Sequence, residues 1–321
     1  MKRFALVKCL FVAGIVVLLC ANVSLAQKKK VLFIDSYHEG YEWSDGEVRG
    51  AKNVLGDKCE FKVVRMDTKR NPSRDFQKKA GEKVKQEIEA WKPDVVIAAD
   101  DPATEFVIVP FYKDKDLPFV FCGINWDVSV YGLPCKNVTG MVEVSMETQL
   151  IEAMHKFAKG DKKGFLGPDN ETTRKEVKNV TTKLNVRFDR DVFVKTFDDW
   201  KKAFMDLQSQ VDMLIVYNYA GIQGWNGAEA KRLVREQTNI PTGGVQEFMA
   251  EYVLITYGKI AEEQGEWSAG AALQILSGKS PQDIPAVTNQ KGQLYANLAI
   301  AKKLNVTFPL TTLKAAKVIK E

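Results

Sequence analysis

Short apolar runs alternate with longer amphipathic stretches along this chain from Lys30 onward. The runs are apolar throughout and rich in β-branched side chains, which is typical of strands buried on both faces of a sheet. In the first half, the pattern predicts strands at 31–35, 61–66, 94–99 and 118–122 and helices at 44–55, 75–91 and 102–112. The first helix opens on a capping-box pattern, Ser44-Asp45-Gly46-Glu47. The order βαβαβαβ indicates a parallel sheet with helices on both faces.

The same rhythm restarts after a turn-rich segment at 123–144, which holds an extended stretch at 138–142. Further strands are predicted at 163–166, 192–197, 213–217 and 242–245, and helices at 146–158, 171–184, 199–208 and 228–237. No sequence repeat relates the two halves, so their similarity is inferred from the rhythm alone. An apolar strand at 252–257 and a small-residue helix at 260–276 follow, and such a tail can return to the first half.

The whole pattern predicts an α/β fold of two doubly wound parallel-sheet lobes joined by a hinge. Lobe 1 is expected to comprise residues 27–142 plus about 250–279, and lobe 2 residues 143–249 plus about 280–321. Ligands lie outside the carboxyl ends of strands in open parallel sheets. The cleft between the lobes is therefore the expected binding surface.

The N-terminal segment has the three parts of a secretion signal. It begins with basic residues, continues with an uncharged aliphatic run at 10–19, and ends with small residues suited to cleavage after Ala26. The run is short for a bilayer span, so a retained anchor is the less favoured alternative. Lipidation at Cys20 would need small residues before it, and two leucines stand there. We expect a signal peptide over residues 1–26 and a soluble, periplasmic protein.

Charge and cysteine content narrow the function further. Loss of the signal would remove three basic residues and lower the net charge from +5 to +2, with basic and acidic side chains interspersed throughout. The chain therefore lacks the basic stripe that nucleic acid requires, and no nucleic-acid partner is expected. Cys59, Cys122 and Cys135 would remain. Cys122 and Cys135 could form a disulfide in an oxidising compartment, or all three could stay reduced.

Motifs for cofactors and catalysis are absent from the sequence. It has no CxxC or CxxH spacing for a metal, no P-loop, no G-x-G-x-x-G after the first strand and no G-x-S-x-G elbow. We therefore expect no metal, no cofactor and no catalytic residue. Asp100 and Glu39 could serve as an acid and base pair in a secreted hydrolase, which remains an alternative.

The third predicted strand is followed by two carboxylates and a helix start. Asp101 is the expected N-cap, and the free amides near Thr104 could hold a ligand carboxylate. Capping would not explain Asp100, which lies at the end of the strand and could pair with a ligand ammonium. We predict that Asp100, Asp101 and Thr104 contribute to the binding site.

The loop after the first strand is dense in aromatic and ionisable groups, including Tyr37, Glu39 and Trp43. Rings of this kind can stack on a flat ligand or cover a cation. They could equally pack against the neighbouring helix.

The corresponding loops of lobe 2 supply amides, carboxylates and a ring. The candidates there are Asp169, Asn170, Asn218, Tyr219 and Glu247. Asn and Glu offer donors and acceptors, and Tyr219 offers a face for stacking. Asp169 could instead be the N-cap of the helix that follows.

Several segments resemble one family. Residues 276–285, with the sequence LSGKSPQDIP, are similar to an L-x-G-x-x-P-x-D-I-P segment, and residues 297–306, with NLAIAKKLNV, to an N-x-x-x-A-x-x-L-G-I close. Asn137-Val138-Thr139-Gly140 and Lys92-Pro93-Asp94 are similar to further segments. The family is that of ABC-transporter solute-binding proteins that include tryptophan-type amino-acid binders, with relatives among histidine kinase sensor domains. The resemblance implies the type I periplasmic binding protein fold.

The chain departs from this family where the ligand should bind. Asp100-Asp101-Pro102 adds two carboxylates where the family commonly has a Thr-Pro or Ser-Pro turn. Asn125-Trp126-Asp127 stands where an Asp-Pro turn is usual, which makes Asn125 and Trp126 further candidates for ligand contact.

Together, these features predict a monomeric periplasmic binding protein that closes its lobes over a small polar ligand. The resemblance points to an amino acid, above all an aromatic one, and to an ABC permease in the inner membrane as partner. A receptor that hands the closed lobes to a sensor kinase is the alternative in another class.

Overall fold

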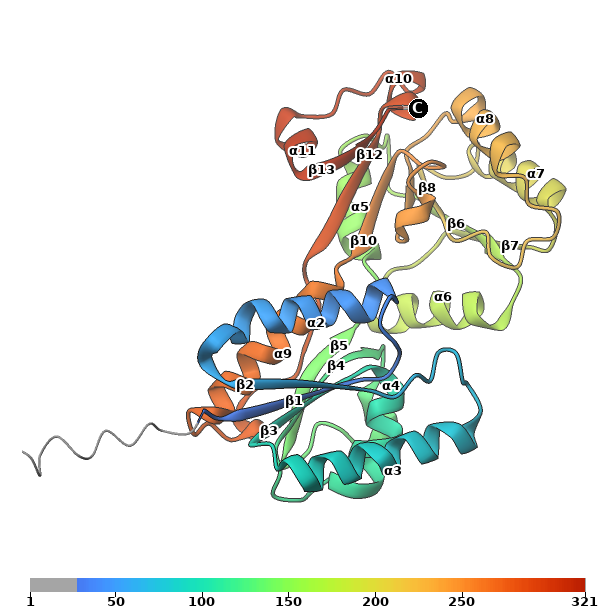
Figure 1. Cartoon of the computed structure of the whole chain (residues 1–321). Coiled ribbons are helices and arrows are strands. Elements are labelled where there is room, and N and C mark those ends of the chain that lie inside the picture. The colour runs from blue at the N-terminus through green and yellow to red at the C-terminus, as the bar shows by residue number, and fades with distance from the viewer. Residues whose placement is uncertain (1–27, 321) are drawn as a thin grey trace, which may run out of the picture.

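The computed structural model describes residues 28–320 and shows two α/β lobes (Figure 1). The predicted signal peptide lies outside the described residues. One β-sheet forms the centre of each lobe, with six strands in lobe 1 and seven in lobe 2. We use lobe 1 and lobe 2 for these sheets together with the helices that cover them. Within residues 28–320, no helix combines the length and the apolar character needed to cross a bilayer.

The sheet of lobe 1 is parallel throughout, in the order β11-β5-β4-β3-β1-β2. Its strands are β1 (Lys30–Asp35), β2 (Glu60–Arg65), β3 (Val95–Ala99), β4 (Phe119–Asn125), β5 (Val138–Glu143) and β11 (Val287–Thr288). Along β1, Val31 and Phe33 enter one apolar cluster while Leu32 and Ile34 enter another on the opposite face. Helices bury both faces, which explains why residues 31–34 are all apolar.

The helices of lobe 1 are α2 (Glu42–Leu55), α3 (Arg74–Trp91), α4 (Asp100–Ala103) and α9 (Ala261–Leu276), with a π-helical segment at Thr104–Tyr112. Helices α2 and α9 lie side by side on one face of the sheet, and α3 and the π-helical segment cover the other. Glycines allow α2 and α9 to approach closely, because a Cβ on Gly265 would collide with the backbone carbonyl of Glu47. Short 3-10 turns lie at Gly56–Lys58 and Val128–Tyr131.

The sheet of lobe 2 has the order β13-β12-β10-β9-β8-β6-β7, and only β10 and β12 are antiparallel. Its strands are β6 (Lys163–Pro168), β7 (Arg190–Val194), β8 (Met213–Val216), β9 (Thr242–Gly244), β10 (Ile255–Lys259), β12 (Gly292–Asn297) and β13 (Ala316–Ile319). Its helices are α5 (Glu147–His155), α6 (Glu171–Lys183), α7 (Phe197–Leu207), α8 (Gly227–Gln237), α10 (Leu298–Lys303) and α11 (Leu310–Ala315), with a 3-10 turn at Glu247–Met249. The 3-10 turn at Pro281–Asp283 packs against β5 and belongs to lobe 1. In its core, the buried Trp200 ring stacks on Phe204 with centroids 5.2 Å apart.

The chain passes between the lobes three times, after β5, after β10 and after β11. Asn289 ties two of the passages together, because its Oδ1 accepts a hydrogen bond from Val144 N at 2.7 Å. The buried Glu263 carboxylate accepts from the backbone N–H groups of Gln290 and Lys291, both at 2.9 Å. Three adjacent connections of this kind form a hinge about which the lobes can rotate.

The predicted fold of two α/β lobes with parallel-dominated sheets is confirmed. Helix α2 differs from the prediction, since it begins at Glu42 and its N-cap, Tyr41, makes no side-chain cap. Ser44 instead donates from Oγ to Asp35 at 2.8 Å, and Glu47 lies one turn into the helix on its buried side. The predicted helix at 102–112 is largely π-helical and contains Pro110, which has no N–H to donate.

The C-terminal quarter differs most from the expected division into lobes. Strand β10 pairs in the sheet of lobe 2 and β11 in that of lobe 1, whereas the prediction placed these segments in the opposite lobes. Strands β12 and β13 were not predicted as strands. The spacing of apolar residues distinguishes a strand from a helix, but it does not show which sheet a strand joins.

The three cysteines in the described part of the chain are free thiols. Cys122 is buried among side chains of α2 and α9, while Cys135 packs against the cluster on the other face of the sheet. The sheet thus separates the two residues that could have formed a disulfide.

Candidate ligand-binding site

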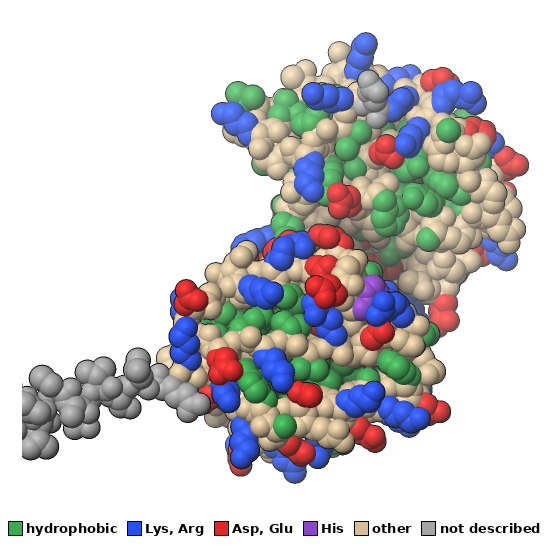
Figure 2. Space-filling model, in the orientation of Figure 1, with side chains coloured by type: hydrophobic (Ala, Val, Ile, Leu, Met, Phe, Trp, Pro, Cys, Tyr) green, Lys and Arg blue, Asp and Glu red, His purple; other side chains and the backbone are tan. Residues whose placement is uncertain are grey.

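A cavity of about 460 Å³ lies between the lobes, in the range typical of small-molecule sites. Lobe 1 contributes Tyr37, Tyr41, Trp43, Lys69, Asp100, Asn125 and Glu143, and lobe 2 contributes Val245, Gln246, Glu247, Phe248, Gly258, Lys259 and Tyr295. A second cavity of about 440 Å³ adjoins it and shares Trp43, Glu247, Lys259 and Tyr295. Figure 2 shows the surface narrowing between the two lobes. A ligand here would contact both lobes at once.

Asp100 occupies a strained position at the end of β3. Its φ of 68° lies in the left-handed region, which residues other than glycine rarely adopt. The side chain lines the cavity although the residue is only 2% exposed, and Oδ2 has no hydrogen-bond partner among the described residues. Burial raises the pKa of Asp100 well above its ordinary value, and the charges of Glu143, Asp35 and Asp101 raise it further.

Glu47 lies directly behind Asp100. It is fully buried on α2, and neither carboxyl oxygen has a hydrogen-bond partner in residues 28–320. Burial raises the pKa of Glu47 well above its ordinary value, followed by the charge of Asp100. Gly123 fits between the two groups with a φ of 69°, and a Cβ there would stand 2.7 Å from Glu47 Oε1 and 2.8 Å from Asp100 Oδ1.

Aromatic rings form a large part of the cavity wall. Tyr37 and Tyr41 meet edge to face with centroids 5.3 Å apart, and the Lys69 ammonium lies 4.8 and 4.9 Å from their ring centroids. Phe248, from lobe 2, is 48% exposed and lies edge-on to Tyr219. Such rings can stack on a flat ligand, and the position of Lys69 shows that they already accommodate an ammonium group.

Lys259 and Glu143 form an ion pair at the point where the sheets of the two lobes meet. Burial alone would lower the pKa of Lys259, but the carboxylates of Glu143, Glu176 and Glu147 raise it, so the lysine stays charged. Both residues end strands, β5 and β10, from which the chain passes to the other lobe. The pair therefore belongs to the hinge as well as to the cavity wall.

Two further contacts join the lobes beside helix α6. Trp126 donates from Nε1 to Glu176 at 2.8 Å, and Lys183 donates to Asp127 at 2.7 Å. Figure 1 shows α6 lying along lobe 1 at this point. Trp126, a predicted ligand contact, thus contacts the other lobe instead of lining the cavity.

Five of the predicted binding residues line the cavity, namely Tyr37, Trp43, Asp100, Asn125 and Glu247. The other candidates of lobe 1 have local roles. Asp101 accepts a hydrogen bond from the Tyr131 hydroxyl at 2.8 Å and is not an N-cap, and Thr104 is fully buried in the helical segment. Glu39 has a side chain that is 81% exposed, so it does not face Asp100 as the hydrolase alternative requires.

The remaining candidates of lobe 2 lie outside the cavity. Asn170, not Asp169, caps α6 by accepting from Thr173 N at 2.9 Å, and Asn218 accepts from Ala220 N at 2.9 Å within its own turn. Tyr219 stacks on Trp225 with centroids 4.8 Å apart.

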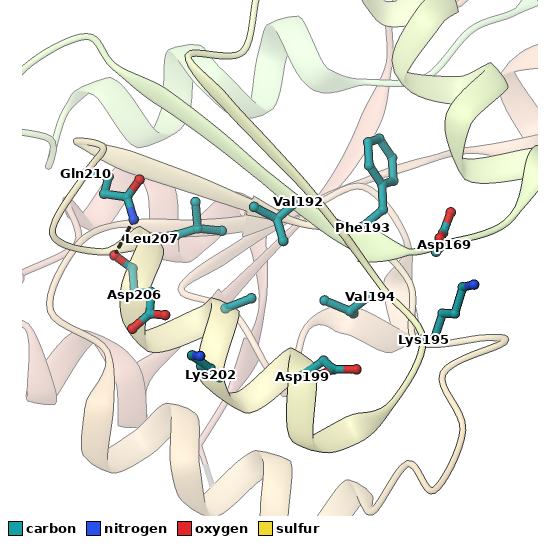
Figure 3. Close-up of a pocket in the computed structure, with 11 residues that line it drawn as sticks. Asp169, Val192, Phe193, Val194, Lys195, Asp199, Lys202, Asp206, Leu207 and Gln210 are labelled. Atoms are coloured by element: carbon teal, nitrogen blue, oxygen red, sulfur yellow. Dashed lines mark hydrogen bonds between the residues drawn. The ribbon is translucent and has the colours of Figure 1, made fainter.

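Asp169 belongs to a different depression. It pairs with Arg174 at 2.7 Å and lines a groove of about 520 Å³ along strand β7 and helix α7 (Figure 3). Strand β7 is the outer strand of the lobe 2 sheet, so this groove lies away from the strands at the hinge.

Sequence reasoning missed the charged residues of the cavity that lie nearest the hinge, Glu143 and Lys259, as well as Lys69 and Tyr295. Glu143 and Lys259 are the last residues of β5 and β10, and the sequence pattern predicts an extended segment at each strand. The same pattern does not show where the chain crosses from one lobe to the other. Glu47 was interpreted as part of a cap, although it lies on the same helix face as Gly50 and Ala51.

Two lobes of parallel-dominated sheet, linked by three crossings around a cavity, define a protein of the type I periplasmic binding class. A model of the family described as ABC transporter substrate binding protein matches residues 45–320, and the chain belongs to this family. The resemblance seen in the sequence is thereby confirmed. No curated protein matches the chain.

Solved structures agree on the fold. An open, ligand-free substrate-binding protein with adhesive properties from Clostridium difficile has a TM-score of 0.66 at 17% identity, covering 91% of this chain and 99% of that one. A domain in complex with L-Trp from Streptococcus pneumoniae has a TM-score of 0.52 at 18% identity, covering 92% and 100%. A periplasmic ribose ABC transporter protein from Conexibacter woesei reaches 0.54 at 16% identity, covering 91% and 99%. The family is one of substrate-binding proteins.

Proposed function

We propose that this protein is the monomeric periplasmic solute-binding component of an ABC importer and captures an amino acid, with aromatic ones favoured. Membership of the family implies a small-molecule ligand and an ABC permease as partner. A solved structure of similar fold holds L-Trp, which is consistent with this ligand class.

The observation that carries the proposal is the Asp100 carboxyl in an interlobe cavity walled by aromatic rings. A buried carboxyl oxygen without a partner, here Oδ2, calls for a donor, and a charged donor is the strongest. The α-ammonium of an amino acid would supply it. Asn125 and Lys69 line the same cavity and offer donors for the α-carboxylate.

The side chain of the amino acid would lie against the rings. Tyr37 and Trp43 line the cavity from lobe 1, and Phe248 and Tyr295 from lobe 2. A ligand that contacts both lobes stabilises the closed arrangement over the open one, because only the closed form makes both sets of contacts. Closure would create the shape that the permease recognises.

Thermal-shift screening of the mature protein against the twenty amino acids, nucleosides and sugars tests the ligand class. We expect an aromatic amino acid to raise the melting temperature most, because a ligand that binds only the folded state stabilises it by mass action. Asp100→Asn should weaken that binding at least about tenfold in calorimetry, in line with the loss of a charged hydrogen bond. The matched control, Asp169→Asn, removes a carboxylate outside the cavity and should leave the affinity unchanged. Stabilisation by a sugar and by no amino acid would refute the proposal.

A further inference from the structure

We propose that Glu47 makes the cavity specific for a positively charged nitrogen group, and that docking of this group releases the one proton that Glu47 and Asp100 share without ligand. This inference rests on the proposed amino-acid function, since it assigns the groups that receive the ammonium. It concerns a residue that does not line the cavity and acts through one that does.

The geometry joins the two carboxyl groups into one unit. One oxygen of each group lies within 2.8 Å of the position that a Cβ of Gly123 would occupy, so any side chain at this residue would come between them. The Gly123 backbone N–H donates to Gln264 Oε1 at 3.0 Å, which anchors this point of β4 to helix α9. Two ionised carboxylates have only acceptors, so a hydrogen bond between them requires a shared proton.

The other acidic groups around the pair have partners of their own. Asp35 lies 3.3 Å from Arg65, Asp101 accepts from the Tyr131 hydroxyl at 2.8 Å, and Glu143 forms the ion pair with Lys259. These carboxylates oppose ionisation of the pair, and the groups that act most strongly on Glu47 are all acidic.

Two further titratable groups near the pair are neutral at physiological pH. Burial raises the pKa of the Cys122 thiol on β4 and of the Tyr37 phenol after β1, and α9 contributes the uncharged Gln264. Two ammonium groups line the cavity: Lys69 lies over the rings of Tyr37 and Tyr41, and Lys259 is paired with Glu143. Two buried negative charges without a counter-ion are very costly, so one proton stays on the pair.

A ligand ammonium changes this balance. It places a positive charge against Asp100, which makes the doubly ionised pair favourable, and the shared proton passes to the solvent. A ligand with a hydroxyl in place of the ammonium brings no charge and leaves the proton where it is. The pair therefore selects a cationic nitrogen over a neutral isostere of the same shape.

Linkage gives the direction of the pH dependence. Binding that releases a proton becomes stronger as the pH rises towards the pKa of the pair in the ligand-free protein, by about tenfold per pH unit when one proton is released. Calorimetry of the mature wild-type protein with the amino acid that gives the largest thermal shift, in phosphate and in Tris between pH 6 and 8, measures the number of protons released. We expect a value approaching about one and a rising affinity. The α-hydroxy analogue of the same amino acid should bind at least about a hundredfold more weakly.

Variants identify the source of the proton. Glu47→Gln should remove both the proton release and the pH slope while the protein still binds, whereas a residue with only a structural role would leave the slope in place. Asp100→Asn should likewise abolish proton release, which keeps the test valid if Glu47→Gln does not fold. Asp169→Asn is the control and should retain the wild-type slope.

The possible failures are distinguishable. An amino acid that binds wild-type protein without proton release and independently of pH would overturn this inference and leave the proposed function standing. Binding of simple amines such as tyramine, with proton release but with no amino acid bound, would refute the proposed function and support the role of Glu47. Binding of uncharged sugars alone would overturn both.

Discussion

Glu147 offers a measurement of what a buried carboxyl group costs this fold. It opens helix α5 at the hinge side of lobe 2 and is fully buried. Burial raises its pKa from the ordinary 4.5 to about 7, the Glu176 carboxylate adds to the rise, and Ser145 and Lys259 oppose it. We predict that the free energy of unfolding of Glu147→Gln changes much less with pH than that of wild type between pH 4.5 and about pH 7.

The magnitude follows from linkage. A group whose pKa is higher in the folded protein than in the unfolded chain holds its proton longer when folded, so stability falls as the pH rises from 4.5 to about 7. At about 1.4 kcal/mol per pKa unit, the loss is about 3 kcal/mol and is complete above pH 7. The glutamine does not titrate, so the variant should gain about 3 kcal/mol on wild type between pH 4 and pH 8.

Urea unfolding followed by circular dichroism at pH 4, 5, 6, 7 and 8 gives the free energy of unfolding for both proteins. The test is how the difference in free energy of unfolding between variant and wild type changes with pH. Any effect of the new amide that does not depend on pH cancels in this comparison. Glu152→Gln alters an exposed glutamate on the same helix and should track wild type at every pH. A difference between Glu147→Gln and wild type that stays constant from pH 4 to pH 8 would refute the reasoning.

Two further predictions concern the backbone. Gly265→Ala should lower the free energy of unfolding by about 1 to 3 kcal/mol, because its Cβ would collide with the Glu47 carbonyl, whereas Gly270→Ala on the same helix meets nothing within 4 Å and should raise it by about 0.5 to 1 kcal/mol. Equal effects in urea unfolding would contradict the close approach of α2 and α9. Asp100→Gly should raise the melting temperature at pH 8 by relieving the left-handed strain and the buried charge, while calorimetry shows binding lost.

The strands of lobe 1 could be predicted because burial on both faces of a strand requires consecutive apolar residues. Strands β1 and β3 lie within a residue of their predicted bounds, since helices cover both sides and the positions inside each strand are apolar. Strand β12 has no such run of apolar residues. It contains glycine and polar residues and gains its place by antiparallel pairing with β10, a contact that no local pattern records.

The sequence predicts those residues of the candidate site that lie at strand ends. It does not predict those that reach the cavity because the chain crosses between the lobes. Asp100 and Asn125 follow or end adjacent parallel strands, so position alone placed them at the cavity. Asn170 and Asn218 occupy similar positions in lobe 2, but their side chains bond to the backbone of their own turns. Lys259 reaches the cavity only because β10 ends at the hinge, which requires knowledge of the topology.

The buried carboxyl groups of this protein gather where the lobes meet, and their placement argues for a charged ligand more strongly than any single contact does. Glu47 and Asp100 lie on lobe 1 and Glu147 on lobe 2, each with at least one oxygen that lacks a partner in the described residues. A protein selected for stability alone would replace them with apolar side chains, because buried unpaired acids lower stability. A cation that enters with the ligand offsets this cost only when the cavity excludes water. Under the proposed function, the charge of the ligand would therefore also favour the closed arrangement of the lobes, and recognition and closure would depend on the same carboxyl groups.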